Sequence, residues 1–108
     1  MDVFTAIAEP TRRDIVQMLA KRGSLASSDI AKSFDSTPSA ISQHLKILRE
    51  ARLVRVHKKA QQRIYEIELE AIIELEDWLD HLKAVWNQRF DRLEQVLKDK
   101  EKNHVKDN

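Results

Sequence analysis

The stretch that most constrains the fold of this chain is residues 34–49, which encodes a helix start, a buried face and a polar face. Thr37 can cap the helix, because its hydroxyl can accept a hydrogen bond from an otherwise unpaired backbone N–H. Pro38 follows at the first helical position, where a missing N–H is harmless. Apolar residues recur at intervals of four and three on one side: Ile41, Leu45 and Leu48. The sequence therefore predicts an amphipathic helix with a well-fixed start.

The opposite face of this helix carries hydrogen-bonding side chains, and not only charges. These are Ser39, Ser42, Gln43 and Lys46. Ser and Gln can donate to and accept from base edges, and Lys can reach guanine or a phosphate. A face of this composition suits the major groove of DNA, so residues 34–49 are interpreted as a recognition helix.

Length and composition indicate one domain of a globular protein. A chain of 108 residues is too short for two ordinary domains, and 42% hydrophobic with 34% charged residues is typical of a helix-rich soluble protein. No apolar run approaches the roughly 20 residues that a membrane span requires. The N-terminus lacks the layout of a signal peptide and the chain has no cysteine. We therefore expect a cytoplasmic protein without a membrane partner.

The charges are unevenly distributed along the chain. Residues 1–66 hold 12 Lys and Arg against 7 Asp and Glu, whereas residues 67–108 hold 7 against 11. The basic excess is strongest in residues 32–63, with 8 basic and 2 acidic residues, which is the kind of patch that attracts phosphates. An ordinary solvated face explains such a patch equally well, so composition alone does not decide between them.

The flanking patterns predict the other elements. A short helical turn at the start leads into a helix that begins near Pro10 and ends at Gly23, and a brief helix capped by Ser27 follows. With the recognition helix, this places a helix-turn-helix at about residues 27–51. Two β-prone runs then predict a basic hairpin, or wing, at about 53–69.

A single long helix is predicted from about residue 70 to 97. Its apolar residues recur at helical intervals and fall within an arc of roughly 80°. A helix of this length spans about 42 Å, which is longer than the small body it must pack on. Part of the stripe should therefore need a second chain. Residues 98–108 are polar and unpatterned and are expected to form a frayed tail.

Several motifs, taken in order, resemble those of the ArsR-type winged-helix transcriptional repressors. The matching segments are Ala8–Arg13, Asp29–Ala31, Ser42–Ala51, Leu53–Val54 and Arg63–Tyr65, with Trp78 and Trp86 in the closing helix. The match spans about residues 3–97, and motifs at compatible spacings are more specific than one helix-turn-helix match.

The resemblance implies a mainly α fold, a winged helix-turn-helix with a two-stranded β wing and long N- and C-terminal dimerisation helices. Residues 1–97 would form the DNA-binding and dimerisation domain of a homodimer. Its partner would be double-stranded DNA with a near-palindromic operator, and the protein would be a repressor. The operator sequence and the small-molecule or protein effector are not written in the residues.

Two positions depart from the family pattern. Arg52 follows the recognition helix, and Ala60 lies at the wing tip, where the resemblance leads us to expect Gly in both cases. Such sites often require a positive φ, which costs a non-Gly residue energy. We therefore expect the helix end and the wing turn to differ in geometry.

The predicted site residues follow from this hypothesis. The recognition helix would read bases through Ser39, Ser42, Gln43 and Lys46. Phosphates would be held by His44, Arg49, Lys58, Lys59 and Arg63, and the predicted DNA surface also includes Thr37, Ala40 and Gln62. The predicted dimer interface comprises Phe4, Ile7, Leu75, Trp78, Leu79, Leu82, Trp86, Phe90, Leu93 and Leu97.

A metal site is not expected. By family resemblance, metal-sensing branches use thiolates on the first helix of the helix-turn-helix, or carboxylates and histidines on the last helix. This chain has no Cys, Asp80 and His81 are adjacent rather than on one face, and His104 lies in the tail. For His44, packing or a phosphate contact is a better interpretation than metal binding. We therefore expect no metal and no cofactor.

The sequence supports three other functions less well. An enzyme would need a nucleophile and base, and the charges at Glu76, Asp77 and Asp80 are better read as a solvated face. A winged-helix dimer could instead serve as a protein-interaction module. It could also sense a small apolar ligand between its terminal helices near Trp78 and Trp86, although packing is the stronger interpretation of these side chains.

Overall fold

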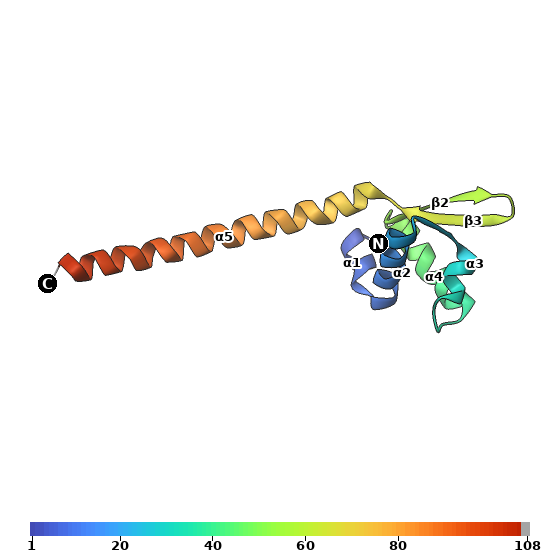
Figure 1. Cartoon of the computed structure of the whole chain (residues 1–108), viewed down its shortest axis with the longest axis horizontal. Helices are drawn as coiled ribbons and strands as arrows, with labels where there is room; N and C mark the ends of the chain where they lie inside the picture. The colour runs from blue at the N-terminus through green and yellow to red at the C-terminus, as the bar shows by residue number, and fades with distance from the viewer. Residues whose placement is uncertain (107–108) are drawn as a thin grey trace. The chain divides into compact units, whose positions relative to one another are not determined.

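The computed structural model describes the backbone of residues 1–106 and the side chains of residues 1–101. Within these residues the chain forms five helices and three strands (Figure 1). They are α1 (Val3–Ala8), α2 (Pro10–Arg22), β1 (Ser24–Ala26), α3 (Ser27–Lys32), α4 (Pro38–Glu50), β2 (Val54–Lys59), β3 (Gln62–Ile67) and α5 (Leu69–Lys106). The chain divides into two compact units, of which the first is Met1–Leu75 and the second begins at Glu76.

The first helices begin at side-chain caps. The Asp2 carboxylate accepts a hydrogen bond from the Thr5 backbone N–H at 2.7 Å and starts α1. Glu9 caps α2 in the same way through the Arg12 backbone N–H at 2.8 Å, with Pro10 at the first helical turn. Ser27, by contrast, is the first residue of α3 rather than its cap, because Ala26 occupies that position and makes no side-chain cap bond.

The sheet has three antiparallel strands in the order β1-β3-β2 within the described residues. The predicted two-stranded wing is therefore a hairpin of β2 and β3 extended by β1, whose Leu25 lies opposite Tyr65. Residues 24–26 were not predicted as a strand, because three residues show no alternation and their partner lies about forty positions further along the chain. The predicted mainly helical winged helix-turn-helix fold is otherwise confirmed.

The core lies where α1 to α4 and the sheet meet in the first unit. Its largest fully buried side chains come from four elements (α2, α3, α4 and β2) and the segment that follows α4: Ile15, Leu19, Ile30, Ile41, Leu48, Leu53 and Val54. Burying a Leu or Ile side chain stabilises a protein by about 1.5–3 kcal/mol. The predicted inward face of the recognition helix is thus the face that attaches α4 to the rest of the unit.

The end of α4 keeps a left-handed residue although it is not glycine. Arg52 has φ 61°. Its N–H donates to the Arg49 carbonyl at 3.0 Å, and the Leu53 N–H donates to the Leu48 carbonyl at 3.0 Å. These are the two bonds of a Schellman motif, closed by a contact between two fully buried leucines. A left-handed conformation costs a non-Gly residue about 1–2 kcal/mol.

The wing turn also contains a non-glycine residue in the left-handed conformation. Ala60 has φ 56° in the two-residue turn between Lys59 and Gln62. Two-residue hairpin turns require positive φ and normally use Gly or Asn. We expected the backbone at Arg52 and Ala60 to differ from that of a glycine, and this prediction is wrong, because both residues have positive φ. The chain adopts the conformation that glycine favours and carries the strain.

Helix α5 is longer than predicted. Its expected end was near residue 97, but it continues to Lys106, so most of the predicted tail is helical. Side-chain pairs one turn apart span the expected end: Glu94 with Lys98 at 3.8 Å and Gln95 with Asp99 at 3.2 Å. Residues 107–108 of that tail lie outside the described residues. No helix in the described part of the chain is long and apolar enough to cross a membrane.

Candidate nucleic-acid interface

The start of α4 determines the orientation of its polar face. The Thr37 hydroxyl accepts a hydrogen bond from the Ala40 backbone N–H at 3.1 Å, so Thr37 is the cap that the sequence predicts. Ile41, Leu45 and Leu48 are buried on the inner side. The predicted reading residues all lie on the exposed side of the helix: Ser39, Ser42, Gln43 and Lys46.

These side chains line a groove of about 710 Å³ between α3, α4 and the sheet. Of the predicted DNA-contacting residues, the groove brings together Ser39, Ser42, Gln43, Lys46, Arg49 and Arg63. Three of these are cationic, and Glu50 is the only acidic residue in the lining. Hydrogen-bonding groups thus lie beside cations that can pair with phosphate, which is the combination that a DNA contact requires.

The wing tip carries the remaining predicted cations. Lys58 lies opposite Arg63 and Lys59 opposite Gln62 in the β2–β3 register, and all four side chains are exposed. Lys58, Lys59 and Gln62 do not line the groove. Arg55 lies three residues before Lys58 on β2 and, unlike the tip lysines, forms an ion pair. Its Nε donates to Glu66 at 2.9 Å.

Arg55 is therefore not equivalent to the tip lysines. The hydrogen bond to Glu66, with the nearby charges of Glu66 and Glu68, raises the pKa of Arg55 above its ordinary value. Lys58, Lys59 and Arg63 have no ion-pair partner within the described residues. The free cations of the wing are thus at its tip.

His44 does not line the groove but connects α4 to α2. Its Nδ1 lies 3.4 Å from Nη1 of Arg12 and 3.7 Å from the Glu9 carboxylate. Arginine can only donate, so in the neutral imidazole Nδ1 accepts and Nε2 carries the proton. This contact holds the His44 side chain against α2, as the packing interpretation of His44 would have it.

The carboxylate of Glu9 belongs to the same cluster. Burial alone would raise the pKa of Glu9, but the backbone N–H groups of Arg12 and Thr11 donate to it and His44 lies nearby. Together these interactions bring the pKa below its ordinary value. Glu9 therefore remains ionised at neutral pH, which suits its role as the cap of α2.

Sequence reasoning missed four residues of this region, among them Tyr65, which lines the groove. Arg12 is buried, and its Nε donates to the Ala6 carbonyl at 2.7 Å, which attaches the end of α1 to α2. Ser27 and Glu50 line the groove. The position of Ser27 at a helix start predicts a capping role, and does not indicate that its side chain lines the groove. Arg12 lies within the Ala8–Arg13 motif, but nothing in the sequence predicts its burial, because its partners become neighbours only when α1 packs on α2.

The predicted dimer residues fall into two groups. Ile7 and Leu75 are partly buried against the core of the first unit, and Phe4 on α1 is 37% exposed. The others lie on α5 and are about half exposed or more: Trp78, Leu79, Leu82, Trp86, Phe90, Leu93 and Leu97. Val85 and Val96 are similarly exposed.

Among the described residues, no group of three His, Cys, Asp or Glu side chains could hold a metal ion. Asp80 is instead near Lys83 on the same helix at 3.9 Å. The side chain of His104, which was considered as a ligand, lies outside the described residues.

Comparison with known proteins places this geometry in a family. Residues 9–56 match the model of a family described as bacterial regulatory protein, arsR family. The transcriptional repressor SdpR of Bacillus subtilis is 36% identical over 78 residues, covering 72% of this chain and 86% of SdpR. The HTH-type transcriptional regulator Rv2034 of Mycobacterium tuberculosis is 39% identical over 77 residues, covering 71% of each chain.

A solved structure agrees with the sequence relatives. The crystal structure of the ArsR family transcriptional regulator RHA00566 aligns with a TM-score of 0.72 and 33% identity, over 79% of this chain and 87% of that one. The matched family segment runs from the α2 cap into β2, and so contains the whole of α4.

Proposed function

Since the chain belongs to the ArsR family of bacterial regulatory proteins, we propose that it is a cytoplasmic homodimeric repressor that binds an inverted-repeat operator. Members of this family are DNA-binding transcriptional regulators and not enzymes, and the same holds for this protein. The proposal adds to this the oligomeric state, the form of the operator and the roles of individual residues.

The observation that carries the proposal is the groove beside α4. In it, Ser42, Gln43 and Lys46 lie on the exposed face of the helix with Arg63 of β3. We assign base reading to the helix and phosphate binding to Arg49, Arg63 and the tip lysines. Amide and hydroxyl groups can discriminate base edges, whereas an isolated cation binds any phosphate.

The homodimer is supported by the apolar stripe on α5. Large apolar side chains such as Trp86 and Phe90 are 64% and 59% exposed, and they recur on one face of the helix. Soluble monomers rarely expose a continuous apolar surface of this extent. A second copy would present an identical stripe, and a two-fold dimer would place two α4 helices in successive major grooves about 34 Å apart.

Selection of bound sequences from random DNA by the purified protein tests the proposal. We expect an inverted repeat whose half-sites are centred about one helical turn apart, together with a dimer in sedimentation at the same concentration. Recovery of unrelated sequences would contradict sequence-specific binding. A dimer that bound no DNA would favour the protein-interaction module instead.

We also propose that operator binding is independent of metal ions. The chain has no cysteine, so the thiolate site of metal-sensing relatives cannot form. Addition of Zn²⁺ or of a chelator should leave operator affinity nearly unchanged in a titration followed by fluorescence anisotropy. A change of about tenfold or more at stoichiometric metal would reveal a site shared across the dimer, with His81 as the first residue to replace.

A further inference from the structure

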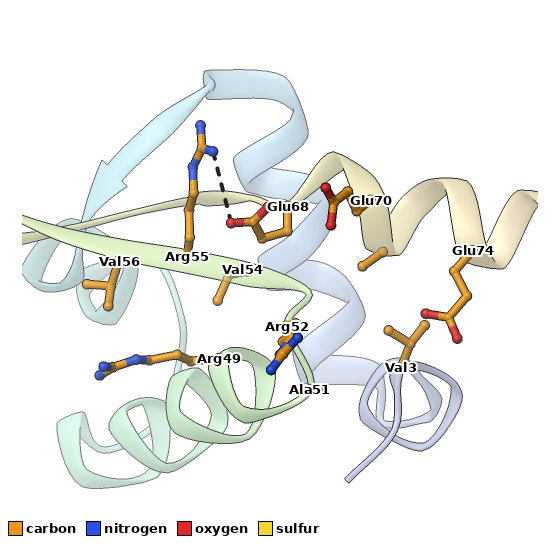
Figure 2. A pocket seen from close by; sticks show the side chains of 11 residues that line it. Val3, Arg49, Ala51, Arg52, Val54, Arg55, Val56, Glu68, Glu70 and Glu74 are labelled. Carbon is orange, nitrogen blue, oxygen red and sulfur yellow. Dashed lines mark ion pairs between the residues drawn. The ribbon is translucent and has the colours of Figure 1, made fainter.

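A second hollow in the first unit lies away from the reading face of α4. Its volume is about 590 Å³, within the range of small-molecule sites. It is formed by the end of α4, by β2, by the first turns of α5 and by Val3 of α1 (Figure 2). Val3, Ala51, Val54 and Ala71 are buried and supply an apolar floor.

The charges around this cavity are separated by sign. Figure 2 shows Arg49 and Arg52 on the side of α4, and Glu70 and Glu74 on the side of α5. None of these four side chains has a hydrogen bond or an ion pair within the described residues. The other lining charges are already satisfied, since Arg55 lies 4.0 Å from Glu68 and donates to Glu66.

Each wall carries two like charges that are near each other in the sequence. Glu70 and Glu74 are four residues apart and so lie on the same face of α5, where like charges repel. Arg49 and Arg52 are three residues apart at the end of α4. A ligand with a cationic group at the wall of Glu70 and Glu74 and an anionic group at the wall of Arg49 and Arg52 would be attracted to both walls.

Arg52 provides an independent observation. It has φ 61°, the conformation that glycine adopts most easily, and its side chain lines the cavity. A residue kept in a strained backbone conformation points to a role for its side chain. The guanidinium at this position adds a positive charge to the cavity that glycine would not provide.

From these observations we propose that the cavity binds a small zwitterion of the amino acid type. Its carboxylate would lie against Arg52 and Arg49, its ammonium group against Glu70 and Glu74, and its methylene groups over the apolar floor. Guanidinium pairs well with carboxylate because its planar fork can donate two parallel hydrogen bonds.

Binding at this cavity would also affect DNA affinity. Arg49 lines both this cavity and the groove beside α4. A carboxylate bound to Arg49 would compete with a DNA phosphate, so the zwitterion would weaken DNA binding. This coupling, unlike the binding itself, rests on the proposed function.

Calorimetry on the full chain without DNA tests the site. The probes are straight-chain ω-amino acids, from β-alanine through γ-aminobutyrate to ε-aminocaproate, with caproate and hexylamine as ligands of single charge. We expect at least one zwitterion to bind and both singly charged controls to bind about tenfold more weakly or not at all. Failure of the whole series at millimolar concentration, or equal binding of the singly charged controls, overturns the proposal.

Two variants and two matched controls locate the binding. Arg52→Gly and Glu74→Gln should each weaken binding by about tenfold. Arg52→Gly should at the same time raise the melting temperature, so a loss of binding cannot be attributed to misfolding. Ala60→Gly relieves the same type of strain outside the cavity, and Glu76→Gln removes a charge of α5 that does not line it; both should bind normally. Undiminished binding by Arg52→Gly and Glu74→Gln would exclude this cavity.

The coupling is tested separately with DNA. A saturating zwitterion should weaken DNA binding by the wild-type chain about tenfold, and Arg52→Gly should bind DNA normally without this response. An equal response in Arg52→Gly would overturn the coupling. If neither the wild-type chain nor Arg52→Gly bound DNA, the proposed function would fail. Calorimetry without DNA would still show whether the cavity binds a zwitterion.

Discussion

The two units of the molecule use apolar residues in opposite ways. In Met1–Leu75, large side chains such as Ile15, Ile30 and Leu48 are completely buried by other parts of the same chain. From Glu76 to Glu101 every described side chain is exposed, including large hydrophobic residues such as Trp86 and Phe90. The first unit therefore gains its hydrophobic stabilisation by folding. We propose that the second gains it by packing against a second copy of the chain.

Truncation of the stripe should have the largest effect. Trp86→Ala removes a large aromatic from both copies of the proposed dimer, and central aromatic residues of interfaces commonly contribute about 2 kcal/mol or more each. We expect a loss of about 4 kcal/mol per dimer, or roughly a thousandfold increase in the dissociation constant. Sedimentation equilibrium over a range of concentrations measures this change.

Gln88→Ala is the matched control for the stripe. Gln88 is exposed and lies on the face of α5 opposite to Trp86, two residues away. It should leave the dissociation constant unchanged. Equal effects of Trp86→Ala and Gln88→Ala, or a wild-type chain that is monomeric at every concentration, would remove the distinction between the two units.

A core substitution in the first unit should act on folding instead. Leu48 is fully buried on the inner face of α4, and a Leu→Ala change at such a site costs about 2–5 kcal/mol in the free energy of unfolding. Denaturant unfolding at one fixed protein concentration measures the loss. If Leu48→Ala changed only dimerisation, the first unit would not be the independently packed body that its burial indicates.

Within the first unit, the helix and the wing should differ in what they recognise. Gln43→Ala should cost about 1–3 kcal/mol at one base position per half-site, because a side chain that pairs with a base edge is lost. Lys58→Ala should weaken binding to every sequence and lower the salt slope by about one unit per phosphate contact. Titrations against operator and scrambled DNA at several salt concentrations separate the two. Identical profiles would contradict the division into reader and clamp.

The local signals were enough to predict α4. A cap, a proline at the first helical turn and a three-four apolar spacing all act within one helix, so Thr37, Pro38 and Leu45 could be assigned from neighbouring residues alone. The exposed reading face followed from the same periodicity. Its four residues all line the groove: Ser39, Ser42, Gln43 and Lys46.

What could not be predicted depends on contacts between distant segments. β1 exists because Leu25 pairs with Tyr65, and Arg12 is buried because α1 ends against it. Nor does the sequence reveal that Arg52 adopts the left-handed conformation that glycine favours. That outcome depends on a balance between local strain and the buried leucines that close the end of α4.

The smallest expected effect compares the two units through one substitution, Ala→Gly, which should stabilise the first unit and destabilise the second. Ala60 has φ 56°, so Ala60→Gly relieves a left-handed strain of about 1–2 kcal/mol and loses part of that gain to the greater freedom of the unfolded chain. We expect a net stabilisation of about 0.5–1 kcal/mol. Ala84→Gly, at an exposed helical position of α5, should instead destabilise by about 1 kcal/mol. Chemical denaturation of both variants decides the matter, because the same substitution must change stability in opposite directions. Destabilisation by Ala60→Gly as well would mean that Ala60 carries no strain, and that the turn of the wing tolerates alanine as readily as glycine.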